Sequence, residues 1–470
     1  MALNYIVFLL AYSVVLLCVG ILFSKRMKSV EDFFLASRNL PASWIFFSLS
    51  ASWIGATSIL VTVDQAYKEG LSSFWIIGVP AVLTVALFAL FLTHPIRRLP
   101  ILTLPDLVEM RYGRTVRHLA SALIIWYMIL LASSQMVALG NFLKIFLRSS
   151  YFSCLILGTV VVLIYSVFGG FLSVVFTDGL QLFLLLVGIG GFFVFLVQSS
   201  AFQEIAQAAI GLEKLDYFNF FYNLKKNFLM ALSFTLAWII SPIAWQRIQS
   251  ARSVRSAQHG LWATAITLLF FFGMIVGLGL FSLPLFPSGD WEVPLLSWII
   301  STKTGFFLGG FLFVAVVAAI MSTMDTAINT GALSVTHDVY FRIFPQREIG
   351  HGVSVSRIST ILIAAMAFLI ATRFQDILKT LGLASEIMAE GLFVPGLAML
   401  YLKKRWPAAG FLSLVAGGGF ALLVFLCEVK LLVLNWPTWP NSVPYGLALS
   451  LAGFIVGLFI DTCWGRFRRI

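Results

Sequence analysis

Long apolar runs alternate with short polar segments along the whole chain. A helix needs about 20 apolar residues to cross the ~30 Å hydrocarbon core of a bilayer. By this measure the pattern predicts an all-α membrane protein that forms one integral domain over residues 1–470, without a separate soluble domain. The thirteen predicted spans are 3–24, 42–66, 71–94, 119–147, 151–169, 171–199, 227–246, 260–286, 305–336, 354–372, 377–402, 408–427 and 441–461.

Two of these spans are interrupted. The second contains a run of small and polar residues from Ser48 to Ser58, and the seventh contains the pair Ser241-Pro242. A proline inside a helix removes one backbone hydrogen bond and frees a carbonyl. Because the two breaks are five spans apart, they indicate two inverted five-helix repeats with a binding site near the bilayer midplane. For either span alone, small residues that only permit close helix packing are the alternative.

Composition and charge support the membrane assignment. Hydrophobic residues make up 60% of the chain and charged residues 11%, which excludes an ordinary soluble domain. The net charge of +11 comes from Lys and Arg clusters in alternate loops, as is typical of cytoplasmic loops rather than of a nucleic-acid surface. Most of the 31 basic residues fall on one side of the bilayer. We therefore expect a multi-pass protein of the cell membrane, with its N-terminus outside, its C-terminus in the cytoplasm and no nucleic-acid partner.

Acidic residues occur inside the predicted spans, where a charge is costly and usually functional. Almost no basic residue is expected at a comparable depth to pair with them. These acids should therefore be protonated or bind a cation. They are Asp64, Asp178, Asp325, Glu386 and Glu390.

The ninth span contains the sharpest cluster of polar residues. Ala319, Ser322, Thr323 and Thr326 recur at helical spacing and lie on one helix face, with Asp325 beside them. Hydroxyl, carbonyl and carboxylate oxygens are hard ligands, which suit an alkali cation better than a transition metal. Hydroxyl groups that bond back to their own helix are the alternative. The aspartate in the cluster favours a cation site.

Four short stretches occur together in a pattern typical of one family of carriers. They are Ser50-Ala51-Ser52-Trp53-Ile54-Gly55; Phe168-Gly169-Gly170 with Thr177-Asp178; Trp245-Gln246-Arg247; and Met321-Ser322-Thr323 with Thr336-His337-Asp338-Val339-Tyr340. In these stretches the chain resembles the sodium:solute symporter family. The resemblance implies a LeuT-type core of two inverted repeats, 42–199 and 227–402, with a leading helix at 3–24 and accessory helices at 408–461.

The resemblance also implies ion sites. The main sodium site would use the backbone carbonyls of three residues and the hydroxyls of two more. These are Ala51, Ile54 and Ala319, and Ser322 and Thr323. A second site, for sodium or for a proton, would consist of Asp178, Ser322, Asp325 and Thr326. Several family members have serine in place of Asp325, so this chain would place two carboxylates there.

For the solute, the resemblance implies a site between the broken spans. The candidate residues are Trp53, Thr57, Ser58, Gln135, Trp238, Ser241 and Glu386. The run around Trp53 is similar to the choline-carrier branch, where a tryptophan helps to enclose a quaternary ammonium group, a contact that cation–π attraction explains. A cationic or zwitterionic amine or amino acid is therefore the leading hypothesis, and a monocarboxylate or other anion is the alternative.

The expected activity is secondary active transport by alternating access, with sodium as the coupling ion and one or two sodium ions per cycle. An enzyme is not expected, because the sequence contains no nucleophile–base pair and no metal-binding set. A membrane sensor for a solute, acting through a partner protein, is the competing class. The sequence does not predict an oligomeric state.

Overall fold

The computed structural model describes residues 2–24, 30–99, 101–286, 293–344 and 348–467. Within these ranges the chain is helical, and the extended backbone pairing consists of one isolated bridge between Leu40 and Ala251. The structure therefore confirms the predicted all-α class. The first part of the chain contains α1 (Ala2–Ser24), α2 (Val30–Leu35), α3 (Ala42–Trp53), α4 (Thr62–Glu69), α5 (Gly78–Leu87), α6 (Thr93–Arg98), α7 (Leu104–Tyr112), α8 (Arg114–Leu147), α9 (Tyr151–Ser199) and α10 (Phe202–Gly211).

The second part of the chain continues the bundle. It contains α11 (Leu224–Ile239), α12 (Pro242–Ser250), α13 (Val254–Ser282), α14 (Leu295–Thr302), α15 (Phe306–Leu333), α16 (Phe341–Ile343), α17 (Glu348–Ala371), α18 (Ile377–Glu386), α19 (Phe393–Tyr401), α20 (Pro407–Glu428) and α21 (Val443–Phe467). Short 3₁₀ segments occur at Ala36–Arg38 and Gly70–Trp75. Wider π-helical turns occur at Thr57–Val61, Phe88–Leu92, Ser334–Tyr340 and Ile387–Leu392.

By length and composition, eleven helical stretches of the described chain could cross a membrane. Two of them, Thr57–Arg98 with 42 residues and Tyr151–Ser199 with 49, are each much longer than one crossing requires. The second bends at Gly170, whose φ of 58° and ψ of −163° are not helical. The sequence pattern divided each stretch into two spans, which is why it predicts thirteen. That count stays a prediction.

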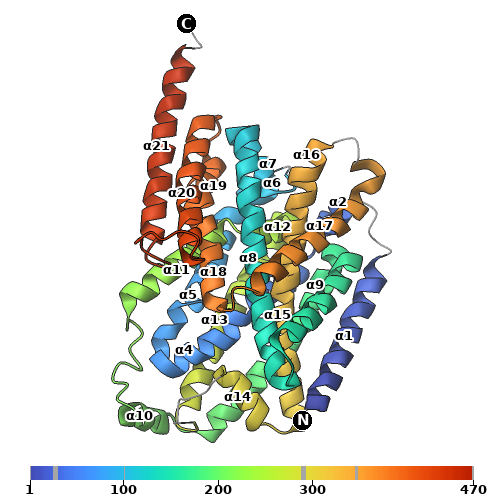
Figure 1. Ribbon diagram of the computed structural model, residues 1–470, viewed down its shortest axis with the longest axis vertical. Coiled ribbons are helices and arrows are strands. Elements are labelled where there is room, and N and C mark those ends of the chain that lie inside the picture. Colours follow the sequence, from blue (N-terminus) through green and yellow to red (C-terminus); the bar gives the residue numbers. More distant parts are fainter. Residues whose placement is uncertain (1, 25–29, 100, 287–292, 345–347, 468–470) are drawn as a thin grey trace.

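The longest helices form the centre of the bundle (Figure 1). Helix α15 packs against α8 and α9, and α3 lies against both α9 and α13. Helix α1 covers α9 from the outside, whereas α20 and α21 pack together as a pair at the opposite edge. The two broken helices and α15 are therefore surrounded by other helices, which shields any polar site between them from lipid.

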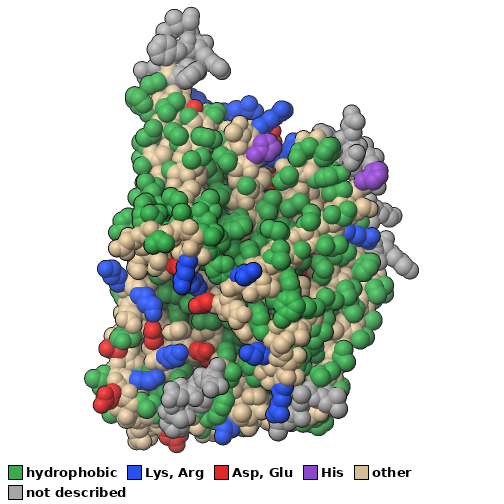
Figure 2. All heavy atoms as spheres, in the orientation of Figure 1, with side chains coloured by type: hydrophobic (Ala, Val, Ile, Leu, Met, Phe, Trp, Pro, Cys, Tyr) green, Lys and Arg blue, Asp and Glu red, His purple; other side chains and the backbone are tan. Residues whose placement is uncertain are grey.

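The outer surface is largely apolar. Figure 2 shows hydrophobic side chains over much of one face, between charged residues near its top and others in its lower half. Large apolar side chains such as Phe270 on α13 and Phe459 on α21 are 68% and 70% exposed. Such a surface would be costly in water. It suits lipid, because the backbone polar groups in the middle of a helix are bonded within the helix.

Candidate functional site

Both predicted helix breaks are present. Helix α3 ends at Trp53, and Ile54 leaves the helical region with φ −104° and ψ 80°. The chain resumes as a π-helical turn at Thr57. Helix α11 ends at Ile239, and Ser241, with φ −61° and ψ 122°, leads into α12. Pro242 begins α12, where its missing N–H would have no intrahelical partner in any case.

A side chain from α8 stabilises the non-helical backbone of the first break. The backbone N–H of Ala56 donates to Oε1 of Gln135 at 2.9 Å, which replaces the hydrogen bond lost from the helix. A Cβ atom on Gly55 would lie 2.9 Å from this oxygen and 2.9 Å from Oγ1 of Thr323. The break therefore needs glycine at this position, because α8 and α15 approach its backbone so closely.

Oxygen atoms from the first break and from α15 face one another. Oγ of Ser322 donates to the carbonyls of Ala51 at 3.0 Å and Ala319 at 2.9 Å, and Oγ1 of Thr323 donates to the carbonyl of Ser52 at 3.2 Å. The structure thus brings together four of the five predicted main-site residues. The fifth, Ile54, is adjacent and fully buried. Buried carbonyl and hydroxyl oxygens form a ligand set that suits a sodium ion.

The residues of the predicted second site also lie close together. Oδ2 of Asp178 on α9 accepts from Ser48 at 2.7 Å, and Oδ2 of Asp325 on α15 accepts from Tyr165 at 2.6 Å. The remaining oxygen of each carboxyl group is buried and has no hydrogen-bond partner among the described residues. The negative charge of Asp178 acts on the carboxyl group of Asp325. The sequence named Ser48 only as part of the break in the second span. It did not assign Ser48 or Tyr165 to this site, since neither lies on the patterned face of the ninth span.

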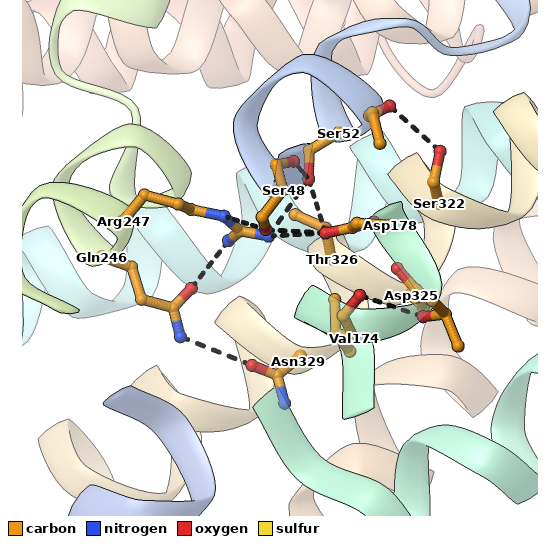
Figure 3. A network of polar contacts seen from close by, with 12 residues as sticks. Ser48, Ser52, Val174, Asp178, Gln246, Arg247, Ser322, Asp325, Thr326 and Asn329 are labelled. Atoms are coloured by element: carbon orange, nitrogen blue, oxygen red, sulfur yellow. Dashed lines mark hydrogen bonds and ion pairs between the residues drawn. The ribbon is translucent and has the colours of Figure 1, made fainter. Parts of the chain in front are cut away.

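Arg247 corrects the expectation that basic residues are nearly absent at this depth. Its side chain on α12 is fully buried and points toward Asp178 (Figure 3). Nη2 donates to Thr326 at 2.8 Å and to Ser52 at 3.1 Å, and it lies 3.8 Å from Oδ2 of Asp178. The sequence places Arg247 just after the second break, where it is easily counted with the cytoplasmic loop.

Two further charges have structural partners that the sequence did not reveal. Arg117, at the start of α8, is 1% exposed and forms ion pairs with Asp106, Glu109 and Asp338. Asp64 accepts a hydrogen bond of 2.7 Å from the backbone N–H of Leu295, the first residue of α14. A carboxylate there compensates the free N–H groups of the helix end, so Asp64 has a helix-capping role in this structure.

A partly open cavity of about 50 Å³ adjoins the first break. Six of the seven predicted solute residues line it, together with Tyr127 and Thr323. The six are Trp53, Thr57, Ser58, Gln135, Trp238 and Ser241. The seventh, Glu386, lies outside this lining, and its carboxylate accepts a hydrogen bond from Ser442 in the connection between α20 and α21. Tyr127 was not among the sequence candidates, because an aromatic residue in an apolar span has no distinguishing pattern.

The sequence profile described as "Sodium:solute symporter family" matches residues 33–417. The chain belongs to the sodium:solute symporter family. Members of this family are secondary transporters rather than enzymes. This symporter is 23% identical to the high-affinity choline transporter 1 of Drosophila melanogaster over 87% of its own length and 68% of the relative's. It is 26% identical to the osmoregulated proline transporter OpuE of Bacillus subtilis, with 97% and 95% covered, and 25% identical to the sodium/pantothenate symporter of Escherichia coli, with 97% and 96% covered.

Solved structures support the same fold. A Na⁺-coupled sialic acid symporter, in a substrate-bound outward-open state, superimposes on this symporter with a TM-score of 0.79 at 19% identity, and the alignment covers 97% of each chain. Mhp1, a transporter of the nucleobase-cation-symport-1 family, superimposes with a TM-score of 0.53 at 15% identity over 91% of this chain and 93% of its own. The LeuT-type fold expected from the sequence is confirmed.

Proposed function

We propose that this symporter moves a sodium ion and a small organic solute together across the membrane by alternating access. Sodium would bind to the carbonyls of Ala51, Ile54 and Ala319 and to the hydroxyls of Ser322 and Thr323. The observation that carries this proposal is the position of Thr323, which lines the solute cavity and also bonds to a carbonyl of the first break. An ion at this position would stabilise the same backbone that shapes the cavity, and binding of each ligand would then favour binding of the other.

The cavity favours an amine as the solute. Its lining, over the described residues, contains no Asp, Glu, Lys, Arg or His. A monocarboxylate would leave water there without any positive charge beside it, which is costly, whereas the carboxylate of a zwitterion is accompanied by the solute's own ammonium group. Quaternary ammonium groups are weakly hydrated and bind to aromatic faces. Trp53, Trp238 and Tyr127 supply such faces, and the ring centroids of the two tryptophans are 5.5 Å apart. A cationic or zwitterionic amine is therefore the preferred solute class.

Thr57 adds a polar contact to this lining. Its hydroxyl is buried and has no hydrogen-bond partner in the part of the chain that the structure describes. A solute that also carries a hydroxyl, carbonyl or carboxylate oxygen would satisfy it. Because one relative is a pantothenate symporter, a monocarboxylate is the second candidate solute. The uncharged lining of the cavity argues against a monocarboxylate.

The test is sodium-gradient uptake into proteoliposomes with a panel of amines, amino acids, sugars and monocarboxylates. We expect sodium-dependent uptake of an amine. Replacing Trp53 with Leu should lower the apparent affinity by about 10-fold, because a desolvated cation–π contact contributes roughly 1–2 kcal/mol. The matched control is Trp262→Leu on the outer face of α13, where the side chain is 40% exposed. Strong uptake of a monocarboxylate and none of any amine would contradict the solute class.

We further propose that one sodium ion is transported per cycle. The hydroxyl oxygen of Thr326, which a second sodium ion would need, already accepts a hydrogen bond from Arg247. Tyr165 donates to Asp325, and a proton on the free oxygen of this carboxyl group would neutralise it. Reversal-potential measurements on solute-driven flux should give a sodium:solute ratio of one. A ratio of two that falls to one in Asp325→Ala would show a second transported sodium ion instead.

The orientation in the membrane is also a proposal. Helix α1 begins at one end of the long axis and α21 ends at the other (Figure 1), which is consistent with an odd number of crossings. The excess of basic residues in alternate loops supports a cytoplasmic C-terminus. Part of this charge, including Lys25, Arg26 and Arg468, lies outside the described residues. Protease or labelling access at each terminus in intact cells would decide the orientation.

A further inference from the structure

Two carboxyl groups that the transport sites do not use are buried beside the accessory helices. Glu386 ends α18, and Glu390 lies four residues later in the π-helical turn Ile387–Leu392. Both side chains are 0% exposed. One oxygen of Glu386 accepts from Ser442. Its other oxygen and both oxygens of Glu390 have no hydrogen-bond partner among the residues described.

Neighbouring charges do not compensate this pair. The turn packs against α8, α11, α18, α19, α20 and α21. Across the described residues of these helices, the charged group that acts on Glu386 is Glu428, and the one that acts on Glu390 is Glu386 itself. Glu428 is already paired with Lys379. On α21, Asp461 caps the start of α20 through the N–H groups of Ala408 and Ala409.

Among the side chains that the structure describes, the remaining charged residues of the neighbouring helices lie in helix ends. On α8 they are Arg114, Arg117, His118 and Lys144, and on α11 they are Lys225 and Lys226. Two ionised carboxylates without a cation would cost several kcal/mol each in this environment. Protons are therefore needed for the pair to remain buried.

The surroundings suit a proton better than a metal ion. Sodium requires several oxygen ligands that converge on one point. Here the hydroxyl of Ser442 is bonded to Glu386, and the hydroxyls of Ser413 and Ser450 are bonded to each other at 2.9 Å. The close approach of α21 leaves little room, because a Cβ atom on Gly446 would lie 2.1 Å from Oε2 of Glu390. A proton needs no such space.

The same pair is connected to the segment that leads from α20 to α21. Ser442 in residues 429–442 bonds to Glu386. In the same segment Trp439 covers Gly382 so closely that a Cβ atom there would lie 2.5 Å from its ring. Nε1 of Trp439 donates to Ser233 on α11 at 3.1 Å. The segment thus bridges α11 and α18.

These contacts lead directly to the wall of the solute cavity. The ring centroid of Trp439 is 5.6 Å from that of Phe234, and Phe234 stacks on Trp238 at 5.3 Å. Trp238 lines the cavity, as does Leu381, the neighbour of Gly382 in the chain. Undocking of residues 429–442 would therefore remove support from two residues of the cavity wall.

We propose that Glu386 and Glu390 form a proton-binding site whose occupancy keeps residues 429–442 docked on α11 and α18. With a proton bound, the pair carries at most one negative charge and remains dry. With the proton lost, two buried negative charges repel each other and attract water, and water that enters the site competes with Ser442 for the oxygens of Glu386 and so releases the segment. This site lies outside the transport sites and does not depend on which solute is carried.

The first test detects the proton directly. Infrared spectra of the purified protein at pH 7 contain an absorption band from any buried protonated carboxyl group. We expect Glu390→Gln, Glu386→Gln or the double variant to lose part of this band relative to the wild type. Asp461→Asn is the matched control, since Asp461 lies on α21, which packs against the turn, but caps the start of α20. An unchanged band in all three glutamate variants would overturn the proposal.

The second test follows the segment itself by hydrogen–deuterium exchange and mass spectrometry. After correction for intrinsic rates, exchange within 429–442 should increase as the pH is raised in the wild type. It should stay slow across the same pH range in the double glutamine variant, which mimics the protonated pair. Exchange in 429–442 that is independent of pH in the wild-type protein would overturn the proposal, and this result does not depend on whether any variant folds.

Discussion

Replacing Arg247 with Met should destabilise this symporter and at the same time strengthen its response to sodium. Methionine preserves most of the side-chain volume but removes the charge and the donors. Asp178 then loses its nearest cation, and Thr326 and Ser52 lose the donor that now engages their oxygens. Without the guanidinium, the oxygens of Asp178, Thr326 and Ser52 are available to coordinate a cation, which gives a better sodium site than the wild type has.

The magnitude follows from the distance between the charges. Nη2 of Arg247 lies 3.8 Å from Oδ2 of Asp178. With an effective dielectric constant of about 20, two unit charges at this separation attract each other by about 4 kcal/mol. This agrees with the roughly 3–5 kcal/mol that removal of one partner of a buried pair usually costs. In the double variant Arg247→Met/Asp178→Asn, about 2 kcal/mol or more should be recovered, because no unpaired carboxylate remains at position 178.

Equilibrium unfolding in detergent would supply the free energies, and the dependence of Tm on sodium concentration would supply the ion response. Arg117→Met is the matched control. It also removes a buried guanidinium, but at the cluster of Asp106, Glu109 and Asp338. It should therefore lower stability and leave the sodium response unchanged. The reasoning fails if the Arg247–Asp178 cycle shows no coupling, or if both arginine variants respond to sodium like the wild type.

Two other predictions concern packing and pH. Gly417→Ala should cost about 1–3 kcal/mol of stability by overpacking, because the added Cβ would lie 1.9 Å from the carbonyl oxygen of Glu390. Gly419→Ala should be neutral, because the space around this position is open. Burial raises the pKa of Asp106. The hydrogen bond and charge of His337, followed by the charge of Arg117, lower this pKa by more than burial raises it, so it lies below its ordinary value. Asp106→Asn should therefore lower Tm at pH 7, with a loss that shrinks below about pH 4. If Asp106→Asn lowered Tm by the same amount at every pH, the pH prediction would be contradicted. Equal losses of stability in Gly417→Ala and Gly419→Ala would contradict the packing prediction.

The fold was predictable, and the α15 residues of the proposed sodium site could be named, because both follow from patterns along the chain. Apolar runs define spans, and small residues or Pro242 define breaks. The spacing of Ser322 and Thr323 on α15 defines one helix face. Their partners, the carbonyls of α3, came from the family resemblance, since a backbone carbonyl has no signature of its own in a sequence.

The depth of individual charges was not predictable in the same way. Arg247 and Arg117 each lie at a helix end next to a loop, where a residue can equally face water or turn inward. Which direction it takes depends on partners from distant segments, such as Asp178 for Arg247 and Asp338 for Arg117. No spacing in the sequence connects positions that are this far apart.

Glu386 is the opposite case, because the sequence pattern correctly predicted its burial but not the helices that it contacts. Glu386 and Glu390 recur at helical spacing and were both expected to be buried, as they are. The pattern did not say which neighbour they face. The structure turns them toward the accessory helices α20 and α21, because Gly417 and Gly446 allow these helices to approach the turn closely.

The central claim is that sodium binds between the break after α3 and the middle of α15. Binding of radioactive sodium to the purified protein tests it most directly and requires no knowledge of the solute. We predict saturable binding whose affinity falls at least about 10-fold in Ser322→Ala, equivalent to ~1.4 kcal/mol, and is unchanged in Ser121→Ala, a buried serine bonded only within α8. Equal sodium binding by wild type and Ser322→Ala would contradict the account.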